Sequence, residues 1–144
     1  MNFMTKTAHL KTGKLVSVRS ASSSDAKALM DLKRNYIKDT TTIPLELEEY
    51  PLDLSKEKEL IEEYEQSPNS ILILAEINNE LIGNIDLTGS KRSKMSHTAM
   101  LGMGILNEWR NQGLGRILIE SAMTWARENS VSYTHLTLPT ILRV

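Results

Sequence analysis

The segment His97–Asn129, HTAMLGMGILNEWRNQGLGRILIESAMTWAREN, decides the fold of this chain. Its apolar run Ala99–Ile105 predicts a strand. The glycines inside that run indicate that another group comes close to the backbone. A glycine-bearing loop follows at Arg110–Arg116. Apolar residues then recur every three or four positions and predict an amphipathic helix with one stripe against a sheet: Leu114, Ile117, Leu118, Ala122, Trp125 and Ala126.

The loop between this strand and this helix has the properties of an anion site. The first N–H groups of a helix have no intrahelical partner, and they lie at the positive end of the helix dipole. Gly113 and Gly115 would let a phosphate approach those groups without a Cβ in the way. Arg110 and Arg116 flank the loop and can add charge-assisted hydrogen bonds. From the spacing alone, a plain strand-to-helix turn is an equal alternative.

The loop sequence also resembles a known family. Arg110-Asn111-Gln112-Gly113-Leu114-Gly115 is similar to motif A of the GNAT N-acetyltransferases, and LGMGILNEW is similar to that family's fourth strand. The resemblance implies that the loop amides hold the pyrophosphate of acetyl-CoA as co-substrate, and that the end of the strand pairs with its pantetheine arm. The cofactor-binding residues that it implies are Met103, Gly104, Ile105, Arg110, Asn111, Gln112, Gly113, Leu114, Gly115 and Arg116.

The upstream elements agree with this resemblance. A strand at Leu15–Arg19 precedes a helix from Ala26 to Ile37, and Ser55 can cap a second helix that ends near Gln66. Two strands follow at residues 71–75 and 81–87, joined by an Asn-Asn turn. The order β-α-α-β-β-β-α matches the first two-thirds of a GNAT domain. We therefore expect an α/β (α+β) fold with a mixed, mostly antiparallel sheet flanked by helices, and with its C-terminal part missing.

The domain organisation is expected to have three parts. Residues 1–13 are polar and aperiodic and are interpreted as a leader, and residues 14–129 as an incomplete N-acetyltransferase domain. Residues 130–144 are interpreted as a non-native tail, because VSYTHLTLPT resembles the translation of a transposase-type sequencing adapter. The alternative is a short final strand. On the tail interpretation, Tyr133 has no catalytic role and the truncated chain is inactive.

The reaction implied by the resemblance is direct transfer of the acetyl group of acetyl-CoA to a primary amine in a ternary complex. The amine must lose a proton, so a base is needed. Asp86 and Glu108 are the candidates, with His97 as a third. Each also has a structural explanation: Asp86 as an exposed position of a hairpin, Glu108 as a cap of the loop, and His97 as a strand-edge residue. The sequence leaves the catalytic base and acid unassigned.

The acceptor is predicted only as a class: an amino acid, a small amine or a protein N-terminus. The acidic residues Glu46, Glu48 and Glu49 lie in the loop 40–54 and would attract a protonated amine, although a solvated charge run is the favoured interpretation. A non-catalytic CoA-binding or sensing module is the alternative function. A generic nucleotide-phosphate binder is a third.

The composition of the chain narrows the classes of function that remain possible. The 17 basic and 18 acidic residues give a net charge of −1, which does not indicate nucleic-acid binding. The chain has no cysteine, and its three histidines, at positions 9, 97 and 135, are scattered, so no metal site is predicted. No apolar run approaches the length that spans a membrane. We expect a cytoplasmic location and no membrane partner, and a homodimer is left open.

Overall fold

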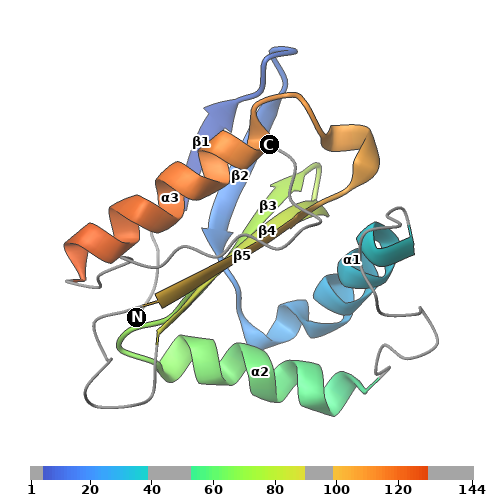
Figure 1. The fold of residues 1–144 in the computed structure, drawn as a ribbon. Helices are drawn as coiled ribbons and strands as arrows, with labels where there is room; N and C mark the ends of the chain where they lie inside the picture. The colour runs from blue at the N-terminus through green and yellow to red at the C-terminus, as the bar shows by residue number, and fades with distance from the viewer. Residues whose placement is uncertain (1–4, 39–52, 90–98, 130–144) are drawn as a thin grey trace.

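The structure, a computed structural model, describes residues 5–38, 53–89 and 99–129. Five antiparallel strands form one sheet in the order β1-β2-β3-β4-β5, with α1 and α2 on one face and α3 on the other (Figure 1). The elements are β1 Lys6–His9, β2 Leu15–Ser20, α1 Ala26–Lys38, α2 Leu54–Gln66, β3 Ile71–Ile77, β4 Glu80–Gly89, β5 Ala99–Ile105 and α3 Leu114–Glu128. The predicted mixed, mostly antiparallel sheet flanked by helices is confirmed.

The N-terminal segment differs from the predicted leader. Lys6–His9 forms strand β1, which pairs with β2 so that Lys6 lies opposite Val18 and His9 opposite Leu15. Leu10, in the turn that follows, is only 3% exposed and belongs to the core. The leader interpretation was therefore wrong for this part. Four residues are too few to show a clear hydrophobic period, so the sequence does not indicate a strand here; the pairing with β2 stabilises it.

Two apolar clusters hold the helices on the sheet. The first lies between α3 and the sheet and includes Trp125, Leu118 and Leu114 of the helix with Ile73, Ile85 and Met103 of the strands. The second lies between the sheet and the pair α1 and α2, and it includes Leu29, Leu32 and Ile61 of the helices with Leu72, Leu74 and Leu81 of the strands. The predicted apolar stripe of α3 is the stripe that packs, with Ile117 partly buried at its margin.

A bulge in β4 determines which side chains face α1 and α2. Ala75 pairs with Gly83 but Glu76 pairs with Leu81, so Ile82 is an extra residue in β4. After the bulge, Ile85 and Leu87 face α3. By alternation, the polar residues Asn84, Asp86 and Thr88 face α1 and α2. The Tyr64 hydroxyl of α2 agrees with this, because it donates to Asp86 and also hydrogen-bonds with Thr88.

An ion-pair network joins the sheet to the start of α1. Arg19 of β2 donates two hydrogen bonds to Asp25, at 2.8 and 2.9 Å, and a third to Glu76 of β3, at 2.9 Å. Burial raises the pKa of the Asp25 carboxyl, but Arg19 and the Ser22 N–H outweigh burial and hold the pKa below its usual value. The network fixes the entry of α1 against the β2–β3 pair.

The cap of α2 also differs from the prediction. Asp53, not Ser55, is the N-cap, because its carboxylate accepts the backbone N–H groups of Ser55 and Lys56 at 3.0 and 3.3 Å. The acidic residues Glu46, Glu48 and Glu49, His97 and the tail 130–144 lie outside the described residues. No helix in the described part of the chain is long and apolar enough to span a membrane.

Candidate functional site

The predicted anion loop lies at the start of α3. After β5, a 3₁₀ turn at Asn107–Trp109 leads to Gly113, the N-cap of α3, with φ +90°. This left-handed conformation suits glycine, which has no Cβ to clash with the backbone. Among the described residues, no side chain makes a capping hydrogen bond to the N–H groups of its first turn. The described geometry therefore presents backbone donors at the positive end of the α3 dipole.

The flanking arginines have partners within the protein. Arg110 Nε donates to the carbonyl oxygen of Ile105 at 3.2 Å, which ties the loop to the end of β5. Arg116 Nε pairs with Glu120 at 2.9 Å on an exposed face of α3. Gln112 Nε2 donates to the carbonyl oxygen of Glu108 at 3.0 Å. Arg110 and Gln112, two of the residues predicted to bind the cofactor, therefore also stabilise the conformation of the loop.

The β1–β2 hairpin supports this loop, which the sequence did not predict. The Lys11 N–H donates to the carbonyl oxygen of Gln112 at 2.8 Å. A Cβ at Gly113 would lie 3.5 Å from Lys11 Cγ, so the Lys11 side chain reaches the N-cap of α3. Lys14 Nζ lies 5.0 Å from the centre of the Trp109 ring. The sequence contains two lysines here but no pattern that links them to a loop a hundred residues later.

Asp86 occupies the middle of β4, directly opposite Gly102 of β5. A Cβ on Gly102 would lie 2.7 Å from Asp86 Oδ1, so the carboxylate fills the space that the glycine leaves. Thr88 Oγ1 donates to Asp86 Oδ2 at 2.9 Å, and the Tyr64 hydroxyl donates to the same oxygen at 3.4 Å. Burial raises the pKa of Asp86, against the opposing effects of Thr88 and of the Lys33 charge. A carboxylate whose pKa is raised in this way is suited to accept a proton.

Tyr64 of α2 completes this cluster. Its hydroxyl lies 2.5 Å from Thr88 Oγ1. Burial and the charge of Asp86 raise the pKa of the Tyr64 phenol, so it stays protonated at neutral pH. Lys33 of α1, the cation that acts on Asp86, pairs with Glu57 of α2 at 3.0 Å. Sequence reasoning missed Tyr64 because it lies on another element, 22 positions before Asp86.

The two predicted bases do not lie at one place. Glu108 is exposed in the 3₁₀ turn beyond the end of β5. Asp86 pairs with Gly102, three positions before that end, on the face covered by α1 and α2. Met103 and Ile105 of the predicted cofactor strand are buried in the α3 cluster. Their side chains are therefore part of the core, so only their backbone groups are available to a cofactor.

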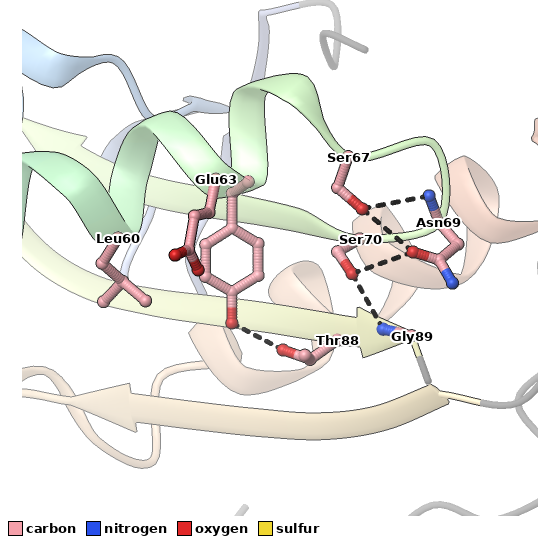
Figure 2. Close-up of a pocket in the computed structure, with 8 residues that line it drawn as sticks. Leu60, Glu63, Ser67, Asn69, Ser70, Thr88 and Gly89 are labelled. Atoms are coloured by element: carbon pink, nitrogen blue, oxygen red, sulfur yellow. Dashed lines mark hydrogen bonds between the residues drawn. The ribbon is translucent and has the colours of Figure 1, made fainter. Parts of the chain in front are cut away.

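A pocket of about 180 Å³ opens beside the Asp86 cluster, between the C-terminal half of α2 and the end of β4 (Figure 2). Leu60, Glu63, Tyr64 and Ser67 line it from the α2 side, and Thr88 and Gly89 from β4. Asn69 and Ser70 form its far wall, which is fixed by hydrogen bonds: Ser67 Oγ donates to Asn69 Oδ1 at 2.9 Å, and the Gly89 N–H to Ser70 Oγ at 2.9 Å.

One buried polar atom on the same face of β4 has no partner. Asn84 is 4% exposed, and its Oδ1 accepts no hydrogen bond from the described residues. Asn84 lies opposite Gly104, two positions from Asp86. Within residues 5–38, 53–89 and 99–129, no group of three metal-ligating side chains could hold an ion.

Comparison with known proteins gives a consistent result. The model of the acetyltransferase (GNAT) family matches residues 37–141. The GNAT-family acetyltransferase from Streptococcus pneumoniae has a similar structure, with a TM-score of 0.79 and 25% sequence identity, over 85% of this chain and 73% of that one. No curated protein has a sequence that matches the chain significantly.

Two further solved structures share the fold at lower identity. The PaiA N-acetyltransferase from Thermoplasma acidophilum, in complex with coenzyme A, has a TM-score of 0.67 and 21% identity, over 81% of this chain and 74% of that one. The ribosomal-protein-alanine N-acetyltransferase from Brucella melitensis has a TM-score of 0.67 and 22% identity, over 79% of this chain and 68% of that one. Since the family model matches more than half of the chain, and the fold agrees, the chain belongs to the GNAT acetyltransferase family.

Proposed function

We propose that the protein transfers the acetyl group of acetyl-CoA to a primary amine. The observation that carries this proposal is the start of α3, which has no side-chain cap hydrogen bond, follows β5 after the turn at Asn107–Trp109 and has Gly113 at φ +90°. The N–H groups of this turn would bind the diphosphate of acetyl-CoA, as in other helix N-terminal phosphate sites. The relative solved in complex with coenzyme A shares this fold, which supports the assignment of the co-substrate.

The pantetheine arm would lie along β5. Among the described strands, β5 is at the edge of the sheet and pairs only with β4. Its outer backbone groups near Met103, Gly104 and Ile105 would pair with the amides of the arm. One of the outer N–H groups would stabilise the oxyanion that develops on the thioester carbonyl.

Asp86 is the base that we assign to this reaction. The amine nitrogen attacks the thioester carbonyl carbon, the C–N bond forms, and the C–S bond breaks to release the CoA thiolate. Asp86 accepts the proton that the amine must lose. Its half-buried position and raised pKa support this role, whereas Glu108 is exposed and lies beyond the end of β5.

The test is acetyl transfer to a panel of primary amines: free amino acids, a peptide with a free N-terminus and alkyl amines. Release of the CoA thiol and the mass of the acetylated amine are measured for the wild type, Asp86→Asn and Asp31→Asn. Asp31 is an exposed carboxylate of α1 and serves as the matched control. We expect Asp86→Asn to lower kcat by about 10²-fold or more and Asp31→Asn to have no effect. Binding of CoA without any transfer would instead favour a CoA-sensing module, and full activity of Asp86→Asn would refute the assigned base.

A further inference from the structure

The pocket between α2 and the end of β4 is lined by Thr88, which hydrogen-bonds to the carboxylate assigned above. We propose that it receives the amine-bearing end of the acceptor, a primary ammonium on a short apolar chain, and that Thr88 passes the proton of this ammonium to Asp86. The inference rests on the proposed function, because it concerns the acceptor of the same reaction. It adds the place where the acceptor binds, its chemical class and the route of its proton.

Thr88 connects the pocket with the base. Its side chain lines the pocket and also donates to Asp86 Oδ2 at 2.9 Å. Tyr64, which lines the same pocket, has its hydroxyl 2.5 Å from Thr88 Oγ1. A group in the pocket therefore meets hydroxyls that are already hydrogen-bonded to the base. Tyr64 acts as a positioning residue, because its hydroxyl holds the Thr88 side chain.

The walls of the pocket determine which group fits. Leu60 and the Tyr64 ring supply apolar surface, and Glu63 is the one charged residue among the described residues that line the pocket. The polar groups of the far wall are engaged with one another, through Ser67, Asn69 and Ser70. The volume of about 180 Å³ is above the roughly 150 Å³ of an apolar cavity that holds benzene. A short alkyl chain that ends in a cation matches these walls in size, polarity and charge.

The proton step balances within this cluster. Thr88 Oγ1 gives its proton to the Asp86 carboxylate and takes one from the ammonium in the same motion. An O–H bond forms on Asp86, the O–H bond of Thr88 is replaced, and an N–H bond of the acceptor breaks. The neutral amine that results attacks the thioester carbonyl carbon, and the second proton, which its nitrogen loses as the amide forms, goes to the departing CoA thiolate, so that CoA leaves as the thiol. The Lys33 charge near Asp86 is compensated by Glu57, so the cluster is not strongly repulsive to a cation.

The kinetic test separates these roles. Thr88→Val should lower kcat at least tenfold, within the usual contribution of proton transfer, whereas Thr88→Ser keeps a hydroxyl and should recover most of the activity. Glu63→Gln should raise the KM for an alkyl amine several-fold without changing the KM for acetyl-CoA. Glu62→Gln, an exposed neighbour on α2 that does not line the pocket, is the matched control and should change neither. Unchanged kinetics in both Thr88→Val and Glu63→Gln, with an active wild type, would overturn the proposal.

A binding test gives an answer that does not depend on catalysis. Butylammonium chloride is titrated into ¹⁵N-labelled full chain, with n-butanol as the uncharged probe, and amide shifts are followed by NMR. We expect saturable shifts that include Tyr64, Ser67 and Thr88 for butylammonium, and a severalfold weaker affinity in Glu63→Gln. Shifts confined to other residues, or equal binding of butanol, would overturn the inference even if acetyl transfer occurs. Conversely, pocket binding in a chain that transfers no acetyl group would refute the proposed reaction and leave the cation site standing.

Discussion

Substitution of Gly102 by alanine provides the sharpest test of how Asp86 is held. The Cβ of an alanine at this position would lie 2.7 Å from Asp86 Oδ1, about 0.7 Å closer than the 3.4 Å at which ordinary contact begins. The carboxylate cannot move away freely, because Thr88 donates to its other oxygen at 2.9 Å. Overpacking of this kind costs about 1–3 kcal/mol. Replacing glycine within a strand returns about 0.5–1 kcal/mol, so the clash should dominate.

We therefore expect Gly102→Ala to lower the free energy of unfolding by about 0.5–2 kcal/mol, which corresponds to a fall of about 2–8 °C in the midpoint of thermal unfolding. The assay is urea and thermal unfolding followed by tryptophan fluorescence; of the two tryptophans, Trp125 is 1% exposed and packs in the core between α3 and the sheet. Because Asp86 is displaced, kcat should also fall, by up to about 10²-fold for a shift of an ångström.

A double-mutant cycle with Asp86→Ala isolates the clash. In that background the carboxylate is absent, so Gly102→Ala should stabilise the protein by about 0.5–1 kcal/mol. The sign of its effect thus reverses, and the coupling energy should be at least about 1 kcal/mol. If Gly102→Ala costs the same free energy with and without the Asp86 carboxylate, the reasoning is refuted.

Four further outcomes are expected. The folded-state pKa of Asp86 is raised above its unfolded value, so its ionisation opposes folding: stability begins to fall as pH rises above the unfolded pKa, and the loss is complete once pH passes the folded pKa. Asp86→Asn should therefore gain stability relative to the wild type over this pH range, and pH-dependent urea unfolding would show it. Gly113→Ala has room for its Cβ but must adopt φ +90°, so it should lose about 1–2 kcal/mol and bind acetyl-CoA more weakly in calorimetry; an unchanged affinity would argue against the loop as the diphosphate site. Asn84→Leu removes a buried acceptor oxygen that has no partner among the described residues. It should raise the free energy of unfolding by about 1 kcal/mol or more, and the thermal midpoint by a few degrees. A clear fall in the midpoint would mean that the Asn84 amide is hydrogen-bonded in solution. Arg19→Ala should lower the free energy of unfolding by about 1.5–3 kcal/mol, because Arg19 hydrogen-bonds two carboxylates. Arg116→Ala should lower it by about 0.5 kcal/mol or less, because its partner Glu120 is 63% exposed. Equal losses of stability in a denaturant titration would contradict this contrast.

The sequence predicted those features that depend on local periodicity and turn chemistry. The apolar run Ala99–Ile105, the three-and-four spacing after Leu114 and the glycine at position 113 indicated β5, α3 and the loop between them, and all three are present. Asn78 and Asn79 indicated the hairpin turn, and both adopt positive φ, at 52° and 65°. Asparagine tolerates this conformation better than most residues, so the signal was local.

Elements without a local signal were missed or misplaced. Strand β1 forms because it pairs with β2. Asp53, and not the predicted Ser55, caps α2; both residue types can cap a helix, and the path of the chain selects one of them. The bulge at Ile82, an extra residue of β4 that has no partner in β3, is not indicated by any pattern in the sequence. It nevertheless determines that Asn84, Asp86 and Thr88 face α1 and α2.

By itself, the sequence determined the type and order of the elements and the loop that resembles a phosphate site, because hydrophobic period and glycine conformation act over a few residues. Only the tertiary structure decided which side chains meet: Asp86 with Gly102 and with Tyr64 of α2, and Lys11 with the N-cap of α3. These contacts join residues that are far apart in sequence. They arise from strand register and helix packing, which no short stretch of the chain encodes.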